Sequence, residues 1–217
     1  MAKLVLYSDQ IIEANKQVDK ELMKLFESKT PSIAYIPSCS DPTRKYFKQK
    51  VEYYKALGID EVEYFDLDKE YDEKRRSEIF NFDAIHLSGG NTFYFLNLIK
   101  KRGFIELLQS YVQNGGILIG ISAGSILMTN NIKVAGIGED CDDNFIGIED
   151  ITALGLVDFE FSPHWSGNQE DLFLLGEYAQ AEETTIYVCR DGSGIVVNGE
   201  EIKLIGDIEK IYKDKNK

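Results

Sequence analysis

Residues 115–125 form an apolar run that ends in Gly-x-Ser-x-Gly: Gly115-Gly116-Ile117-Leu118-Ile119-Gly120-Ile121-Ser122-Ala123-Gly124-Ser125. Small residues two before and two after a serine permit the sharp strand-to-helix turn called a nucleophile elbow. This turn lifts the serine hydroxyl above the sheet, and the helix that follows aims its first N–H groups at the same point. The stretch therefore predicts an α/β fold with Ser122 as nucleophile and the Ala123 N–H as an oxyanion donor. Any βα turn that merely packs closely also needs glycines, so the motif alone leaves a structural role open.

Short apolar segments alternate with longer amphipathic ones on both sides of this motif. Such alternation predicts a mostly parallel sheet sandwiched by helices. The expected strands are 4–8, 32–38, 61–67, 84–88 and 117–122. The expected helices are 9–27, 43–57 and 92–113, the last broken near Gly103 because glycine disfavours a helix interior.

The sequence after the elbow is less regular. A polar, acidic stretch at 130–150 predicts a surface excursion beside the sheet. An apolar run at 154–161 leads to Ser162-Pro163-His164-Trp165, followed by a helix-like segment at 168–181. Turn signals at Asp191-Gly192 and Asn198-Gly199 then separate short apolar runs and predict C-terminal antiparallel strands forming a meander; these runs are 186–189, 194–197, 201–204 and 208–212.

Length and composition set the class of protein. The 217 residues fit one domain, 1–217, with 43% hydrophobic and 28% charged residues. A formal charge of −13 repels nucleic acid and anionic lipid. There is no CxxC pair and no run long enough to span a bilayer. We expect a cytoplasmic protein with no metal, no cofactor, no nucleic-acid partner and no membrane partner; the choice between monomer and homodimer stays open.

A serine needs an adjacent base to attack a carbonyl, and histidine suits that task at neutral pH. The chain has two histidines. His86 lies inside a predicted strand, where a packed core histidine is expected. His164 follows a strand in a loop, the usual place for a catalytic base on such a sheet. We therefore predict that His164 is the base, with a surface-loop histidine as the alternative.

A second glycine pair, Gly89-Gly90, also lies between a predicted strand and a predicted helix. Paired glycines let backbone N–H groups approach a ligand, so Gly89 or Gly90 is a candidate for the second oxyanion donor. Asn91 and Thr92 follow and are candidates for substrate contact. A cap at the start of the helix is a compatible role for either side chain.

Three segments together resemble the peptidase E family of serine peptidases: Ser88-Gly89-Gly90-Asn91-Thr92-Phe93, Gly120-Ile121-Ser122-Ala123-Gly124 and Leu154-Gly155-Leu156 running on to Ser162-Pro163-His164. The resemblance covers most of the chain. It implies a fold like the class I glutamine amidotransferase domain, a small peptide as substrate, Ser122 as nucleophile, His164 as base and an oxyanion hole near Gly90 and Ala123.

The chain departs from this family at the acid of the triad. In the family's dipeptidases the acid follows the serine by about fifteen residues, a region that here has no carboxylate. We take Asp140 as the residue that orients His164. Other candidates remain open: Glu139, Asp142, Asp143, Asp158 and Glu160.

A second departure concerns specificity. The family's aspartyl dipeptidases carry an arginine after the histidine, and an arginine provides the fork that binds a carboxylate. Segment 167–172 has no basic residue and contains Glu170 and Asp171. Strict cleavage after aspartate is therefore not expected, and a neutral or basic substrate side chain is at least as plausible.

Two alternative functions remain open. An α/β-hydrolase esterase uses the same elbow, but its histidine ordinarily follows further strand and helix units, whereas His164 comes 42 residues after Ser122. A non-catalytic small-molecule binding or sensor protein could keep the fold without a working triad, because function resides in the site.

Overall fold

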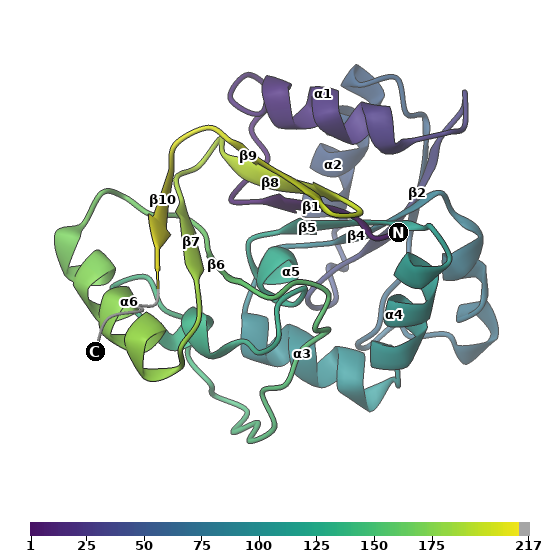
Figure 1. Cartoon of the computed structure of the whole chain (residues 1–217). Helices are drawn as coiled ribbons and strands as arrows, with labels where there is room; N and C mark the ends of the chain where they lie inside the picture. Colours follow the sequence, from purple (N-terminus) through teal and green to yellow (C-terminus); the bar gives the residue numbers. More distant parts are fainter. Residues whose placement is uncertain (213–217) are drawn as a thin grey trace.

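The computed structural model describes residues 1–212, and its centre is a seven-stranded sheet in the order β3-β2-β4-β5-β1-β8-β9 (Figure 1). The first five strands pair in parallel: β1 Lys3–Tyr7, β2 Ser32–Ile36, β3 Glu61–Tyr64, β4 Ala84–Leu87 and β5 Ile117–Ile121. Strands β8, Gly194–Asn198, and β9, Glu201–Ile205, extend the sheet antiparallel beside β1. The predicted α/β class, mostly parallel with antiparallel strands near the C-terminus, is confirmed.

Helices cover both faces of this sheet (Figure 1). Helices α1, Lys16–Leu25, and α2, Lys45–Ala56, lie on one face; α3, Thr92–Lys101, and α4, Ile105–Gln113, lie on the other. The alternation of side chains along β1 makes this division, because Val5 and Tyr7 pack with the first pair and Leu4 and Leu6 with the second.

Of two predicted helices, one is confirmed and the other begins later than expected. The helix expected at 92–113 is broken as predicted, because Gly103 takes φ +64° between α3 and α4. The helix expected at 9–27 begins only at Lys16. Residues before it form a turn in which Asn15 Oδ1 accepts the Ile11 N–H at 2.6 Å, a local bond that competes with helix formation.

A second, three-stranded sheet stands beside the first: β6 Glu160–Ser162, β7 Ile186–Cys189 and β10 Ile208–Ile211, next to helix α6, Gln169–Ala181 (Figure 1). β6 pairs parallel with β7, and β10 pairs antiparallel with β7. The prediction of one C-terminal meander is therefore wrong. The turn at Asp191-Gly192 carries the chain between sheets, since β8 pairs with β1 and covers an edge that would otherwise expose unpaired backbone groups.

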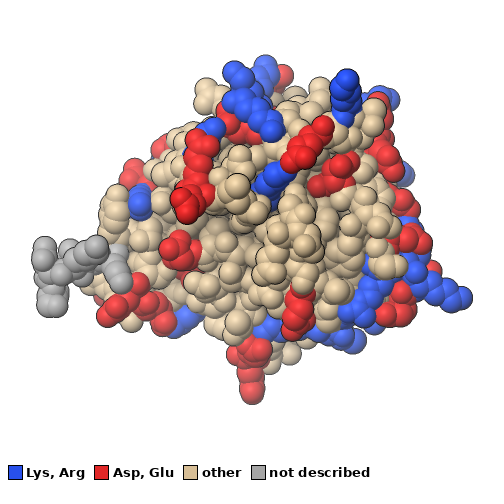
Figure 2. All heavy atoms as spheres, turned by 45° about the vertical axis from the view of Figure 1, so that its right-hand side comes forward, with Lys and Arg blue, Asp and Glu red and all other residues tan. Residues whose placement is uncertain are grey.

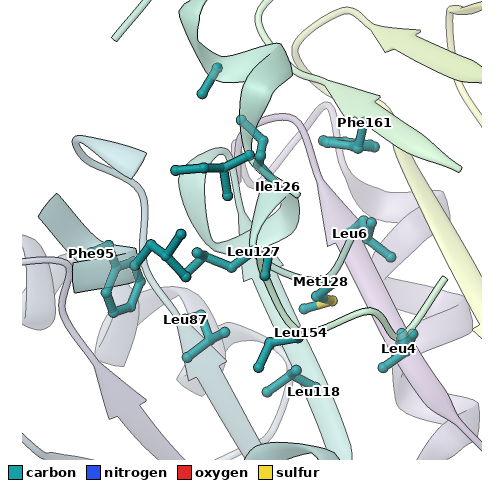
Figure 3. Close-up of a cluster of buried hydrophobic side chains, with 14 of the residues drawn as sticks. Leu4, Leu6, Leu87, Phe95, Leu118, Ile126, Leu127, Met128, Leu154 and Phe161 are labelled. Carbon is teal, nitrogen blue, oxygen red and sulfur yellow. The ribbon is translucent and has the colours of Figure 1, made fainter. Parts of the chain in front are cut away.

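The remaining helical elements are short turns: η1 Glu73–Arg75, η2 Glu78–Asn81, α5 Ala123–Ile126 and η3 Lys133–Gly136. The α5 turn is held in the core, where Ile126, Leu127 and Met128 lie among side chains from the sheet and α3 (Figure 3). All three are at most 4% exposed. A turn packed this tightly gives the elbow a rigid base.

The surface carries charges of both signs. Lys and Arg side chains are interspersed with Asp and Glu on the face drawn in Figure 2, around a largely uncharged centre. Within residues 1–212, no helix has both the length and the apolar character needed to cross a bilayer.

Candidate active site

Ser122 has the strained backbone expected of a nucleophile elbow. Its φ of 51° and ψ of −113° are unusual for a non-glycine residue. The turn needs glycine on both sides: a Cβ on Gly120 would lie 2.5 Å from the backbone of Gly124, and one on Gly124 would lie 2.1 Å from the Leu87 carbonyl oxygen. The Ser122 N–H donates to the Tyr7 carbonyl at 3.0 Å, which fixes the turn to β1.

The Gly89-Gly90 segment passes close to this turn. A Cβ on Gly89 would lie 3.5 Å from Ser122 Cβ, and Gly90 has φ +135° with Ser38 Oγ only 2.1 Å from where its Cβ would be. As the first residue of α5, Ala123 has no acceptor for its N–H inside the helix. Among residues 1–212, no acceptor meets the N–H of Gly89, Gly90 or Ala123. Three backbone donors therefore remain available around the elbow.

The residues after the glycines serve the start of α3. Asn91 Oδ1 accepts the Tyr94 N–H at 2.9 Å, and its Nδ2 donates to the Asp143 carbonyl at 2.9 Å. Thr92 donates from its N–H and its hydroxyl to Asp142 Oδ2, at 2.8 and 2.5 Å. Thr92 lines the pocket described next, whereas Asn91 does not. The structure thus gives Asn91 a capping role, and only Thr92 keeps the placement expected of a substrate contact.

Ser122 and His164 line one cavity of about 130 Å³, which we call the serine pocket. No hydrogen bond joins these two side chains in the described chain, and such bonds are often long before a substrate binds. Gly90 and Trp165 also line this pocket. Four carboxylates do so as well, with no Lys or Arg among the described lining residues: Glu139, Asp140, Asp142 and Asp171. The pocket therefore favours a neutral or positively charged group.

His164 is held at the end of β6 by its own backbone. It has φ +60°, its N–H donates to Ser8 Oγ at 2.8 Å, and the next N–H, of Trp165, donates to the Cys189 carbonyl at 3.0 Å. Its Nδ1 lies 2.7 Å from Asp191 Oδ1. The ring is therefore oriented by a carboxylate, as a general base requires.

Asp191 is in turn held by Ser8. The Ser8 hydroxyl proton is shared between Asp191 Oδ1 at 3.0 Å and the Cys189 carbonyl at 3.2 Å. Ser8 is fully buried, whereas the side chains of His164 and Asp191 are 40% and 46% exposed. The serine thus connects the backbone of the histidine to the carboxylate that contacts its ring.

The structure does not place Asp140 on His164. Asp140 lines the serine pocket, but the His164 ring contacts Asp191 instead. Within residues 1–212, none of the other five candidates, Glu139, Asp142, Asp143, Asp158 and Glu160, bonds to the His164 ring. Asp142 accepts from Thr92, Glu160 from Thr129 and Asn131, and Glu139 from Asn168. Asp140 shares the pocket with His164, but the ring nitrogen Nδ1 is already engaged by Asp191.

The register of the second sheet explains why Asp191 meets His164. Ser162 of β6 lies opposite Val188 of β7 in a parallel pair. The residues just beyond both strands therefore emerge at the same edge, which brings together positions 164 and 191. The sequence carries one signal for this position, since Asp191 lies two residues after the apolar strand β7. The turn at Asp191-Gly192 instead predicts a meander in which β7 pairs with β8, and such a pairing would not bring Asp191 to His164.

His86 is a core residue, in agreement with its position inside β4. It is fully buried, its Nδ1 lies 2.6 Å from the Tyr54 hydroxyl, and burial holds the pKa of the ring well below 6.5. Within residues 1–212, no group of three or more His, Cys, Asp or Glu side chains has a metal-site arrangement.

Comparison with known proteins identifies the family of this chain. The sequence model of peptidase family S51 matches residues 4–205. Peptidase E of Shewanella sp. strain ANA-3 is 33% identical over 141 residues, which cover 61% of this chain and 57% of that protein. The uncharacterized peptidase PM1590 of Pasteurella multocida is 31% identical over 144 residues, which cover 62% of this chain and 65% of that protein. The match thus spans less than two thirds of the length of either relative.

The fold has a counterpart among solved structures. A Listeria monocytogenes EGD-e protein assigned to peptidase E superposes with a TM-score of 0.76 at 24% identity, over 94% of this chain and 98% of that one. This likeness supports the fold, and the family match at residues 4–205 includes Gly89, Ser122 and His164. The chain therefore belongs to peptidase family S51.

Proposed function

We propose that this protein is a serine-type peptidase that cleaves small peptides through an acyl-enzyme on Ser122. The observation that carries the proposal is the shared pocket: Ser122, on a strained turn, and His164, oriented by Asp191 at 2.7 Å, line the same cavity. A histidine oriented by a carboxylate beside an elbow serine is the arrangement that activates a hydroxyl for acyl transfer.

The proposed reaction begins when Ser122 Oγ attacks the carbonyl carbon of the scissile bond and His164 Nε2 takes the hydroxyl proton. Nδ1 stays protonated and donates to Asp191, whose charge stabilises the imidazolium. The oxyanion then accepts hydrogen bonds from the N–H groups of Ala123 and of Gly90 or Gly89. Each such donor contributes about 3–4 kcal/mol in known cases.

The intermediate collapses when His164 gives its proton to the departing amine and the C–N bond breaks. The acyl group remains as an ester on Ser122. A water then attacks this ester, again losing a proton to His164, and Ser122 regains its proton as the acid product leaves. The sequence of steps consumes one peptide and one water and needs no metal or cofactor.

The charge of the serine pocket bears on the substrate. Its carboxylates favour the N-terminal ammonium of a short peptide, with a neutral or basic first side chain. No Lys or Arg of the described residues lines this pocket to pair with an acidic side chain. We therefore propose a substrate preference different from strict cleavage after aspartate.

Labelling by a fluorophosphonate tests the proposal. Wild-type protein should be labelled at Ser122, and Ser122→Ala should lose both the label and all peptide hydrolysis while keeping its fold by circular dichroism. Ser125→Ala is the matched control, because Ser125 Oγ is buried and donates to the Tyr7 carbonyl at 2.9 Å. Folded wild-type protein that neither labels nor hydrolyses any peptide would favour the non-catalytic binding protein.

A further inference from the structure

A second cavity opens on the α2 side of the elbow. It has a volume of about 650 Å³, and we call it the α2 pocket; its walls include Gln10, Ser38, Lys50, Gly90 and Ile121. Gly90 also lines the serine pocket, and Ile121 directly precedes the serine. The two cavities therefore adjoin at the Gly89-Gly90 backbone, one on each side of the proposed oxyanion donors.

Lys50 places a positive charge without an ion-pair partner in this wall. The residue is half-buried on α2, and its ammonium lies 5.5 Å from the centre of the Tyr53 ring. It forms no ion pair or hydrogen bond with any other residue of 1–212. Burial lowers the pKa of Lys50, and Asp9 and Asp19 oppose that shift from a longer distance. A desolvated ammonium without a close partner gains most from a ligand carboxylate.

The carboxylates in the same wall do not neutralise Lys50 by direct contact. Asp41 accepts the Thr43 N–H and hydroxyl at 3.1 and 2.7 Å, and the Tyr46 N–H at 3.0 Å. Asp9 Oδ1 accepts the N–H of the next residue at 2.7 Å. Both carboxylates are thus engaged by other donors, and neither forms an ion pair with the Lys50 ammonium.

The side-chain amide of Gln10 is a second, independent feature of this pocket that points to a bound ligand. It is only 7% exposed, and its Oε1 has no hydrogen-bond partner, whereas its Nε2 donates to the Tyr54 hydroxyl at 3.3 Å. A buried amide oxygen without a partner is costly unless a ligand or water meets it. Because Gln10 lines the α2 pocket, its amide oxygen is a candidate acceptor for a ligand there, beside the Lys50 ammonium.

We propose that the α2 pocket binds the residue on the departing side of the scissile bond, with Lys50 holding its C-terminal carboxylate. This inference rests on the proposed peptidase function and deepens it. A departing amino-acid residue carries both required groups, an N–H for the Gln10 oxygen and a carboxylate for the ammonium. The carboxylate-lined serine pocket then receives the ammonium end of the same peptide.

This placement predicts what the enzyme cleaves. The ammonium end of a zwitterionic peptide matches the acidic serine pocket and its carboxylate end matches Lys50 in the α2 pocket, so the peptide binds in one direction. A chain that continues past the departing residue has no free carboxylate at Lys50. The protein should therefore prefer peptides that end one residue after the cleaved bond.

The test compares dipeptides Xaa-Ala with their amides Xaa-Ala-NH2, Xaa being the best of a panel of neutral and basic residues. For wild-type protein, amidation should lower kcat/KM by about tenfold to a hundredfold, the range for a hydrogen bond to a charged group. Lys50→Met should lower kcat/KM for Xaa-Ala by a similar factor and leave Xaa-Ala-NH2 within about twofold. Lys50→Arg should restore most of the discrimination.

Two controls separate this inference from the proposed function. Lys55→Met removes the same charge from an exposed position of α2 and should behave as wild type. An Xaa-p-nitroanilide has no carboxylate in its leaving group, so wild type and Lys50→Met should cleave it equally, while Ser122→Ala should not cleave it at all.

Three outcomes would overturn the assignment while leaving the peptidase intact. The first is equal discrimination against the amide in wild type and Lys50→Met. The second is an equal loss on the p-nitroanilide in Lys50→Met. The third is a Lys50 dependence seen only with Xaa-Asp-NH2, which would assign the ammonium to a side-chain carboxylate. Failure of wild type on every substrate would instead refute the proposed function.

Discussion

The contact between Asp191 and His164 leads to the sharpest prediction about the triad. Asp191→Asn keeps an oxygen that can accept from His164 Nδ1 but removes the negative charge. Asp191→Ala removes the charge and the acceptor together. If the carboxylate orients the base and stabilises its protonated form, the two variants should lose activity in that order.

The expected loss of activity follows from the solvent exposure of the Asp191 and His164 side chains. A hydrogen bond with a charged partner contributes about 1.5–3 kcal/mol, and about 1.4 kcal/mol corresponds to a tenfold change. The two side chains are 40% and 46% exposed, so solvent screens the charge and the lower end of that range applies. We expect kcat/KM to fall about threefold in Asp191→Asn and about tenfold in Asp191→Ala.

The assay should measure the nucleophile as well as turnover. The second-order rate of fluorophosphonate labelling at Ser122 reports the reactivity of the hydroxyl without dependence on the peptide. It should fall in parallel with kcat/KM, while the melting temperature shows that each variant is folded.

The matched controls are Asp140→Asn and Asp158→Asn. Asp140 lines the serine pocket, so its variant should change KM more than the labelling rate, and Asp158 lies outside that pocket. The role of Asp191 is refuted if Asp191→Ala labels within twofold of wild type, or if Asp140→Asn alone abolishes labelling.

Three further predictions concern the support of the site. Gly124→Ala should lower the free energy of unfolding by about 1–3 kcal/mol and abolish labelling, because its Cβ would lie 2.1 Å from a β4 backbone oxygen. Its control is Gly176→Ala in α6, where the added Cβ meets nothing within 4 Å; denaturant titration should show this variant to be neutral or slightly stabilised. Ser8→Ala removes the hydroxyl that joins the His164 backbone to Asp191, so kcat/KM should fall about tenfold if Asp191 orients the base; unchanged labelling would exclude that role for Ser8. Burial raises the pKa of Glu160 to about 7 from an ordinary 4.5. Between these two pKa values the folded state keeps a proton that the unfolded state releases. The resulting contribution to the free energy of unfolding, at most about 3 kcal/mol, is fully present below pH 4.5 and is lost as the pH rises through 7. Glu160→Gln should flatten the change in unfolding free energy between pH 5 and 8, and an equally steep change would contradict the assignment.

The sequence by itself determined the parts of this protein that depend on local patterns. The elbow at Ser122 could be predicted because its glycines, its apolar strand and its short helix are contiguous in the chain. The β1 to β5 layer was equally readable, since buried parallel strands and amphipathic helices leave periodic patterns. The core position of His86 followed from the same periodicity.

Only the tertiary structure decided which groups meet across distant segments. Asp191 contacts His164 because β6 and β7 pair in parallel, and nothing in either short strand specifies that partner or its direction. Likewise, Lys50 of α2 and Gln10 after β1 become neighbours of the elbow only because the strand order brings the loops after β1, β2 and β4 to one edge. Strand pairing depends on the packing of the whole chain, which is why the elbow at Ser122 could be predicted from the sequence and the contact between Asp191 and His164 could not.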